Sequence, residues 1–462
     1  MDNAVFSESL AYNQMKKRAV SARTFRVKIP PSNSTSFSPG NVIQIDLPGN
    51  LSGQYYNFNQ MYLKLTVTPG ADCAFDRCGA IGLIKRLAIS VSGAQIADIA
   101  NYNVLATALL DTDASCEYKA GYGNVLLGTL GDALKGIDMT GGTAYTFCIP
   151  IVLNPLSMTT PHRLIPAFSL SSIQMRFTLD SAASCVVAAA APALPVTGVE
   201  MVCMMTELSP QAQAMVDSST GGKYNILANS FMNSGATRAG ALTNVTANLG
   251  FSVSSLERII AVHRPAASVD TANRYSLGNR GTAGLSEYQY LINSESYPAR
   301  PVLVSGGAET LAESLIADHA LADFKKSTTL NNGFARIGAA GANFGVGTGA
   351  LSGNAPNQAK SDCFLINAPT GSTAGSVAAA AGGDATASDI GTFLAMTEFE
   401  SGLSDGKSST IYSGISTIAS VVQWVGKYVA PAAGDVILDF WAQYSVLLSL
   451  DMRGSGVWSV SV

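Results

Sequence analysis

Apolar and polar residues alternate along much of this chain with a period of two. The clearest runs cover residues 61–68 and 173–180, in which every second residue is a large apolar one. Alternation of this kind is typical of β-strands that bury one face. Prolines and glycines separate the runs, which predicts many strands joined by irregular loops, as in a sandwich or barrel. Shorter alternating runs occupy residues 25–29, 43–47, 87–91 and 444–452.

Helical periodicity is rare and is best at residues 104–109 and 311–316, where we expect short helices within loops. Each of these helices follows a strand that ends in Val-Ser-Gly, at residues 91–93 and 304–306. Similar features in the same order suggest an internal repeat, and we interpret the chain as two related sandwiches in tandem. The other paired features are the alternating strands at 61–67 and 256–262 and the closing strands at 202–209 and 445–452.

A chain of 462 residues is long enough for two large domains, each with a full core. We place an N-terminal arm, in part an amphipathic helix, at residues 1–23. The first sandwich then covers residues 24–217 and the second residues 218–462.

The second half is longer because of an insertion at about residues 327–390. Within residues 327–383 only Arg336, Lys360 and Asp362 are charged, and Gly, Ala, Ser and Asn dominate. Loops of this length are usually functional or disordered. A segment with so few charges is poorly suited to being fully solvated. We therefore expect it to pack against neighbouring chains or to form the outer crown of an assembly; disorder is the alternative.

Charge is scarce throughout the chain. Only 13% of the residues are charged, about half the usual share of roughly 25%. The formal net charge of -4 excludes a strongly basic nucleic-acid binder, and 8% aromatic residues with so small a net charge exclude a disordered chain. A surface with so few charges suits protein contacts, since charged residues are depleted in interface cores.

One basic segment stands out near the N-terminus, behind the apolar residues Val5, Phe6, Leu10 and Met15. We expect it to face either an anionic membrane or a nucleic-acid backbone, to which basic side chains are attracted without regard to sequence. A solvated tail is the alternative. Six of the 28 basic residues lie within 13 positions of this segment: Lys16, Lys17, Arg18, Arg23, Arg26 and Lys28.

The seven cysteines form no CxxC pair and no disulfide or zinc pattern, and we expect buried thiols in a chain that folds in a reducing compartment. The first residues lack the order of a secretory signal, and no apolar stretch is long enough to span a bilayer. We therefore expect neither export by that route nor a membrane span.

The most enzyme-like segment is the Gly/Ser loop at residues 402–408, which resembles a phosphate-binding loop. That loop needs four residues between its first Gly and Gly-Lys-Ser, and Gly402 leaves only three. The segment also matches the nucleophile elbow of serine hydrolases around Ser404, but no histidine follows it. We predict no catalytic, cofactor or metal site.

The remaining polar candidates have simpler interpretations. His162, His263 and His319 precede Ser404 and have no second histidine or cysteine at ligand spacing. We expect His162 and His263, each beside an arginine, to make hydrogen bonds in loops or interfaces. The four carboxylates Asp72, Asp76, Asp111 and Asp113 lack the spacing of a calcium loop, and we expect them to be solvated turn residues.

A resemblance to a known family is carried by three stretches of the first half. Phe147 to Leu153 is a strand with a proline, Arg163 to Leu170 contains a Leu-Ile-Pro turn, and the alternating strand at residues 173–179 follows. Together they resemble the end of the first sandwich in viral double-jelly-roll major capsid proteins, the group that includes adenovirus hexon and the capsid proteins of lipid-containing phages and virophages. The resemblance covers roughly residues 24–210, and its other parts are residues 24–31, 37–40, 44–48 and 101–105.

The resemblance implies an all-β structural protein with two tandem eight-stranded jelly rolls per chain. It further implies homotrimeric, pseudo-hexameric capsomers that tile an icosahedral virion shell and are folded and assembled inside the host cell. The partners would be other copies, penton or minor capsid proteins, and membrane lipid or genome beneath the shell through the N-terminal arm. No cofactor is implied.

The alternative from another class is a β-sandwich carbohydrate-binding or fibre-type surface protein. Such a protein would use aromatic platforms, for which Trp424, Trp441 and Trp458 are the candidates. A monomer that binds glycans would favour this alternative.

Overall fold

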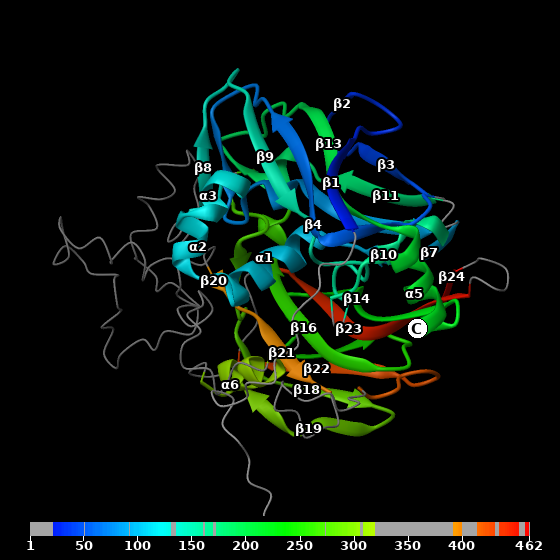
Figure 1. The fold of residues 1–462 in the computed structure, drawn as a ribbon. Helices are drawn as coiled ribbons and strands as arrows, with labels where there is room; N and C mark the ends of the chain where they lie inside the picture. Colours follow the sequence, from blue (N-terminus) through cyan, green and yellow to red (C-terminus); the bar gives the residue numbers. More distant parts are fainter. Residues whose placement is uncertain are drawn as a thin grey trace, which may run out of the picture.

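The computed structural model describes residues 22–49, 51–91, 93–130, 135–159, 162–169, 172–272, 274–304, 308–318, 391–399, 414–429, 434–451 and 458–461. These residues form two β-sheet units that lie side by side, one above the other in Figure 1. The arm up to residue 21, the insertion at 327–390 and the Gly/Ser loop at 402–408 lie outside the described residues.

The upper unit is built from eight main strands in two antiparallel sheets. One sheet has the order β1-β13-β4, with β9 on the free side of β4, and the other has the order β3-β11-β6-β7. We number the eight main strands one to eight in chain order. The first sheet then has the spatial order one, eight, three, six, and the second sheet has the order two, seven, four, five. This is the strand order of a jelly roll. The strands are β1 (Ala22–Ile29), β3 (Val42–Pro48), β4 (Gln54–Val67), β6 (Ile84–Val91), β7 (Ala94–Ile99), β9 (Tyr145–Pro150), β11 (Ser172–Leu179) and β13 (Val196–Leu208).

The lower unit repeats this order. Its sheets are β14-β23-β16-β21 and β15-β22-β18-β19, so the same eight positions pair in the same way. The prediction of two tandem eight-stranded jelly rolls is confirmed. The strands are β14 (Lys223–Arg238), β15 (Asn244–Leu249), β16 (Leu256–Pro265), β18 (Leu285–Ile292), β19 (Glu295–Leu303), β21 (Ala395–Glu398), β22 (Val422–Tyr428) and β23 (Val436–Asp451).

Short strands extend these sheets or connect the main strands. In the first roll they are β2 (Ser36–Phe37), β5 (Cys73–Asp76), β8 (Lys135–Met139), β10 (Ile165–Pro166) and β12 (Val186–Val187). In the second they are β17 (Asn279–Arg280), β20 (Gly391–Thr392) and β24 (Trp458–Ser461). Single turns of 3-10 helix cover Gly79–Leu83, Ala167–Ser169 and Ala266–Ser268.

The period-two pattern matches the burial of the strands. Along β11 the apolar residues Ile173, Met175 and Phe177 are buried in the first core, while Gln174 and Arg176 lie toward the outer face. The same alternation holds along the second half of β4. Burial of one face per strand is therefore what fixes the register of these sheets.

Four of the six described helices lie in equivalent connections of the two rolls. In each roll they follow the fifth strand and precede the sixth: α1 to α3 lie between β7 and β9, and α6 lies between β19 and β21. The predicted loop helices are confirmed. The pairing of the two Val-Ser-Gly sequences is wrong, because the first follows the fourth strand, β6, which ends at Val91, whereas the second follows the fifth strand, β19, which ends at Leu303. The helices are α1 (Tyr102–Asp113), α2 (Cys116–Ala120), α3 (Tyr122–Leu127), α4 (Ala182–Cys185), α5 (Pro210–Thr220) and α6 (Ala308–Ala317).

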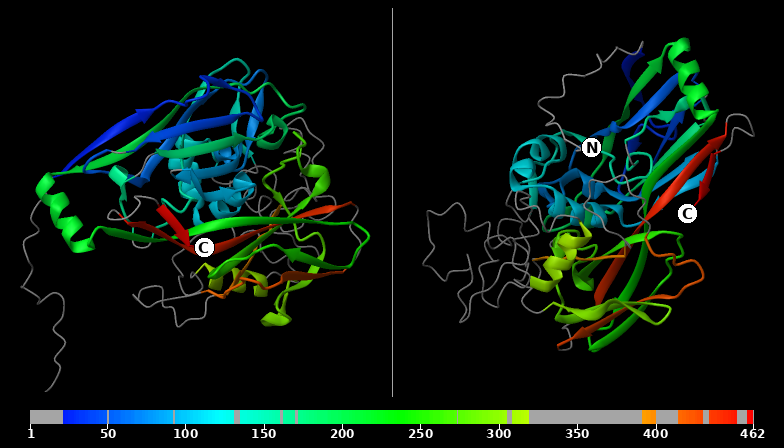
Figure 2. Two further views of the ribbon diagram at one scale, coloured as in Figure 1. Left: turned by 90° about the vertical axis from the view of Figure 1, so that its right-hand side faces the viewer. Right: turned by 60° about the horizontal axis from the view of Figure 1, so that its bottom comes forward.

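Helix α5 connects the rolls along one side of the molecule, as the turned views in Figure 2 show. Ser209 caps the N-terminus of this helix. Its hydroxyl accepts a hydrogen bond from the Ala212 N–H, and Pro210 occupies the first helical turn. Gly221 ends it in the left-handed conformation, with φ 63°. Tyr55 of the first roll donates to Gln213 and Tyr224 of the second roll donates to Asp217, so the helix is fastened to both rolls.

Candidate functional site

A buried ionic cluster joins the two rolls around Asp111 of helix α1. The Asp111 carboxylate accepts from Lys119 Nζ at 2.6 Å and lies 3.4 Å from Arg77 Nη1. Its third partner is Arg280 of strand β17, which belongs to the second roll. The four side chains are 6% exposed or less. An ion pair this deeply buried holds its elements in one geometry, because separating it would leave charges without partners in the interior.

The electrostatics of this cluster favour the ionised carboxylate. Burial by itself would raise the pKa of Asp111, but Lys119, Arg77 and Arg280 together lower that pKa below its ordinary range. Burial in turn lowers the pKa of Lys119, against the attraction of Asp111. The Asp111 carboxylate is therefore a partner that all three cations share.

A second carboxylate, Asp76, fastens the loop before β17 to the first roll. It is fully buried and accepts from the backbone N–H groups of Arg77 at 2.6 Å, Leu277 at 2.8 Å and Gly278 at 3.1 Å. Burial raises its pKa, and these hydrogen bonds oppose the rise. A Cβ atom on Gly278 would stand 2.5 Å from Asp76 Oδ1, so the close approach of the two rolls requires glycine there.

The expectation that Asp76 and Asp111 are solvated turn residues is wrong. Both side chains are buried at the junction of the rolls, with Asp111 inside a helix rather than a turn. The physical reason is that cations from distant parts of the chain surround Asp111, and backbone donors surround Asp76. One feature of the sequence indicated burial of Asp111. It directly follows the apolar pair Leu109-Leu110 on a predicted helix, in a chain with few charges.

A further set of contacts ties the start of α1 to the second roll. Arg264 binds Asp439 through Nε at 3.1 Å and Nη2 at 2.7 Å, and Asn101 Nδ2 of the first roll donates to the same carboxylate at 3.1 Å. The indole N–H of Trp441 donates to the Ala100 carbonyl at 3.1 Å. Asn101 adopts φ 48°, a left-handed conformation that asparagine tolerates better than most residues.

His263 also departs from expectation, since it lies on strand β16 in the core of the second roll. Its ring is 1% exposed and packs against Phe393, Trp424 and Tyr428. Burial lowers its pKa to about 3, so the imidazole is neutral in the folded protein. The expected loop or interface role is wrong for this residue; His162 is exposed, and His319 lies outside the described residues.

The basic segment is only partly described. Lys16, Lys17 and Arg18 lie outside the described residues, whereas Arg23, Arg26 and Lys28 lie on strand β1. Arg23 Nη2 is 2.5 Å from Glu207, and Lys28 is 3.6 Å from Glu200, which Lys64 also approaches at 3.3 Å. Arg26 is exposed. Strand pairing with β13 thus brings acidic neighbours to two of these three cations, and contact of the arm with a membrane or genome stays a prediction.

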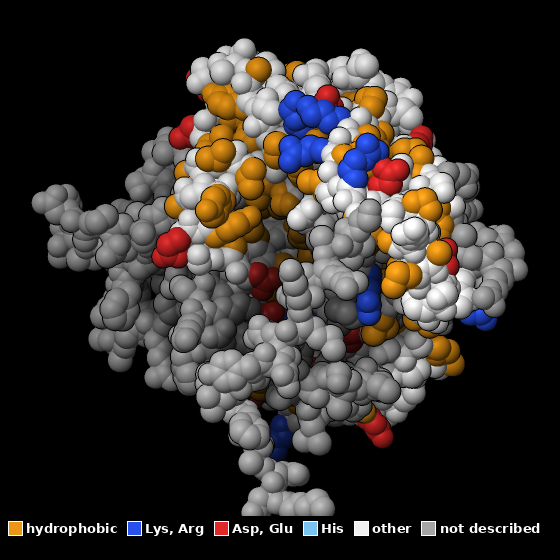
Figure 3. All heavy atoms as spheres, in the orientation of Figure 1, with side chains coloured by type: hydrophobic (Ala, Val, Ile, Leu, Met, Phe, Trp, Pro, Cys, Tyr) orange, Lys and Arg blue, Asp and Glu red, His pale blue; other side chains and the backbone are white. Residues whose placement is uncertain are grey.

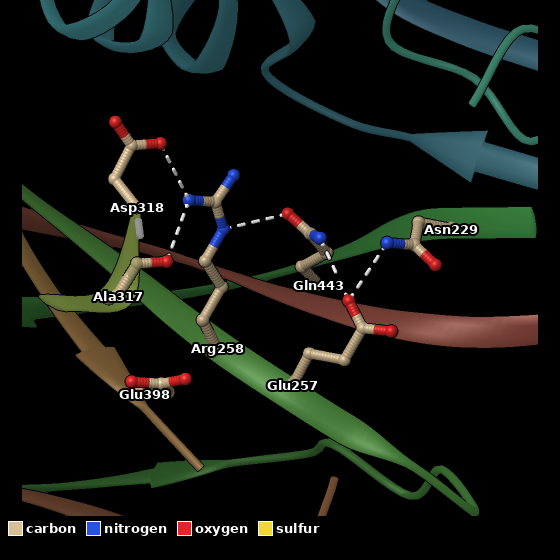
Figure 4. A pocket seen from close by; sticks show the side chains of 7 residues that line it. All are labelled: Asn229, Glu257, Arg258, Ala317, Asp318, Glu398 and Gln443. Atoms are coloured by element: carbon tan, nitrogen blue, oxygen red, sulfur yellow. Dashed lines mark hydrogen bonds and ion pairs between the residues drawn. The ribbon is translucent and has the colours of Figure 1, made fainter. Parts of the chain in front are cut away.

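A polar cavity of about 210 Å³ lies in the second roll beside the end of α6 (Figure 4). Arg258 donates to Gln443 at 2.7 Å and to the Ala317 carbonyl at 3.1 Å, and lies 3.3 Å from Asp318. Glu257 accepts from Asn229 and from Gln443, each at 2.9 Å. The hydrogen bonds from Arg258 to Ala317 and Asp318 therefore hold the end of α6 against the sheet.

An apolar groove of about 510 Å³ lies in the first roll between α1, α2 and the loop after β9. Figure 3 shows apolar side chains gathered on the face where α1 to α3 lie in Figure 1. On helix α3, which contacts α2, Tyr122 and Val125 are each 76% exposed, and Val152 on the groove wall is 48% exposed. Exposed apolar patches of this kind mark interaction surfaces. The lining includes Ile81, Tyr102, Leu109, Leu110, Tyr118 and Leu153.

Among the described residues, no three His, Cys, Asp or Glu side chains gather as a metal site would require. No helix of the described part of the chain is long and apolar enough to cross a bilayer. The described thiols of Cys73, Cys78, Cys185 and Cys203 are free and buried, and Cys148 is half-buried.

Two jelly rolls of identical strand order in one chain define a double-jelly-roll protein. No family model and no curated protein matches the chain in sequence. Solved structures match it in fold. VP54 of PBCV-1, fitted into a reconstruction of the virophage Sputnik, has a TM-score of 0.59 at 11% identity, covering 98% of this chain and 99% of that one.

Two viral major capsid proteins give the same result. The Faustovirus protein matches with a TM-score of 0.59 at 8% identity over 95% of this chain and 92% of its own, and the mavirus protein with 0.50 at 11% over 100% and 96%. The chain thus has the double-jelly-roll fold of viral major capsid proteins, and the resemblance found in its sequence is confirmed at the level of fold.

Proposed function

We propose that this chain is a major capsid protein, a structural component of a virion. The observation that carries the proposal is the pair of equivalent eight-stranded rolls, matched in fold over nearly the full length of two viral major capsid proteins. Isolated jelly rolls occur in many proteins, so one roll alone would say little about function. Two rolls in one chain, matched from end to end, are a far narrower class.

The architecture supports a homotrimeric capsomer. Two rolls of the same strand order, held at a fixed angle by the Asp111 cluster, give each chain two similar outer walls. Three chains in a closed ring then present six similar units, the pseudo-hexameric outline that packs in a shell. The scarcity of charged residues fits a chain that places much of its surface in contacts between copies.

The arm predicted at residues 1–23 lies, on this proposal, beneath the shell, where it reaches membrane lipid, genome or neighbouring capsomers. Neighbouring capsomers, penton proteins and minor capsid proteins are the remaining partners, and the chain folds in the host cell before it enters the virion. Strand β1 begins at Ala22, so removal of residues 1–21 leaves the first sheet intact.

The alternative of a glycan-binding surface protein has less support. Trp424 and Trp441, two of its three candidate platform residues, are buried in the second roll and at the junction. A buried indole offers no face to a sugar ring.

Multi-angle light scattering on the purified chain tests the proposal. We expect a particle of three chain masses of 47.8 kDa each. Truncation of residues 1–21 should leave a particle of three shortened chains while shell assembly or lipid association is lost. A stable monomer that binds a glycan array would contradict the capsid role. A truncated chain that falls apart into monomers would show that the arm holds the trimer together.

A further inference from the structure

The apolar groove of the first roll has no occupant among the described residues, although its walls are built from rigid elements. Helix α1 supplies Leu109 and Leu110, helix α2 supplies Tyr118, and the loop after β9 supplies Val152 and Leu153. We propose that this groove is the docking site for residues 361–367 of the same chain.

The path of the chain brings the long insertion back to the helix that walls this groove. Strand β20 begins at Gly391, directly after the residues outside the description, and Thr392 pairs with Arg280 of β17. Arg280 in turn contacts Asp111, which follows Leu110 on the helix that walls the groove. The insertion therefore ends on the side of α1 that carries Asp111 and faces the junction. Leu109 and Leu110 line the groove on other sides of the same helix, so the connecting chain passes around α1 to reach it.

The chemistry of residues 361–367 fits an apolar groove. Phe364, Leu365 and Ile366 are three consecutive large apolar residues, the only such run between residues 319 and 390. Burying a Phe or Leu side chain contributes roughly 1.5–3 kcal/mol each. Elsewhere the insertion consists mostly of Gly, Ala, Ser, Thr and Asn. Their small side chains offer little apolar surface to fill a groove of about 510 Å³.

The tether has the right length. Residues 367–390 form 24 residues between Ile366 and Gly391. A flexible Gly-rich chain of that length has an end-to-end distance of about 25–30 Å, longer than the roughly 18 Å axis of the 12-residue helix α1. A tethered ligand within reach has an effective concentration in the millimolar range, which favours it over an untethered partner.

Site-specific photocrosslinking on the full chain tests this docking. A benzophenone amino acid replaces Val152 on the groove wall, and in a control protein it replaces Met215, which is 73% exposed on helix α5. We expect irradiation of the first protein to link the probe to a peptide containing residues 361–367, in a product that migrates as a single chain. The control should give no such peptide.

Two variants in the Val152 probe protein sharpen the result. Phe364→Ser with Leu365→Ser should reduce the crosslink at least about tenfold, because two apolar side chains that drive burial are lost. The matched variant Phe344→Ser, an isolated aromatic of the same insertion, should leave it unchanged. Unaltered thermal unfolding of both variants checks that the rolls remain folded.

Crosslinks to residues 1–21, crosslinks to another copy seen at twice the chain mass, or no crosslinked peptide from residues 361–367 would each overturn the proposal. Because the contact lies within one chain, it can be observed in a monomer. Its failure is therefore distinguishable from failure of the proposed capsid role, which rests on the trimer.

Discussion

Replacing Asp111 by Asn tests whether the buried ionic cluster holds the two rolls together. The variant keeps the shape of the side chain but removes the negative charge that Arg77, Lys119 and Arg280 share. Removing one partner from a buried ion pair costs about 3–5 kcal/mol. For a cooperative unit of about 200 residues, this corresponds to a fall in melting temperature of at least about 6 °C.

The matched control is Asp98→Asn, which removes the partner of Arg86 on neighbouring strands of the first roll. That pair has a distance of 2.5 Å but side-chain exposures of 51% and 33%, so its loss should cost under about 1 kcal/mol. Thermal unfolding followed by tryptophan fluorescence compares the two, since Trp441 donates its indole N–H across the junction. Equal melting temperatures for the two variants would refute the reasoning.

A double-mutant cycle separates the ion pair from general damage. Asp111→Asn with Arg280→Met should be less destabilised than the sum of the single variants, because the second change removes one of the uncompensated cations. The pH dependence has a definite sign as well. Since the pKa of Asp111 is lowered from 3.8 in the fold, its stabilisation is complete above about pH 4 and is lost as the pH falls further. An additive cycle would contradict the cluster model.

Three further changes test other parts of the junction and the core. His263→Phe should flatten the acid dependence of stability. With a pKa of about 3 in the fold against 6.5, His263 makes the wild type lose about 1.6 kcal/mol of stability between pH 6.5 and 5. Unfolding midpoints that fall equally in both proteins would disprove the assignment. Gly278→Ala should lower the melting temperature by several degrees, since its Cβ would meet Asp76, whereas Gly250→Ala, with no neighbour within 4 Å, should change it little; similar losses would argue against the close approach. Glu200→Gln should cost under about 1 kcal/mol, because Lys28 and Lys64 hold it at the surface; a larger loss in a denaturant titration would show that this pair is structural.

The strands were predictable from the sequence because a strand with one buried face carries its burial pattern in local order. Along β11, alternate residues from Ile173 to Leu179 face the core, and no knowledge of distant residues is needed to see it. The helices at residues 104–109 and 311–316 were predictable for the same reason. The tripeptide Val-Ser-Gly misled because a turn motif reports local geometry and says nothing about which strand of the fold it ends.

The junction was not predictable because its partners are distant in sequence. Asp111 is 34 residues from Arg77 and 169 residues from Arg280, and a carboxylate on a short helix is usually solvated. Only the meeting of α1 with β17 brings the charges together. The same holds for His263, whose aromatic neighbours Phe393 and Trp424 lie more than a hundred residues further along the chain.

The two rolls share a strand order but not a set of contacts, and this asymmetry has a consequence for assembly. The first roll presents Asp76 and Asp111 to the junction, and the second presents Arg280 and the N–H groups of Leu277 and Gly278. The two faces are therefore complementary rather than alike. A face that is complementary within the chain cannot serve again between chains, so the trimer proposed above would have to use the opposite walls of the rolls. Because separating buried charges costs several kcal/mol, the junction holds the two rolls of one chain in a single relative geometry.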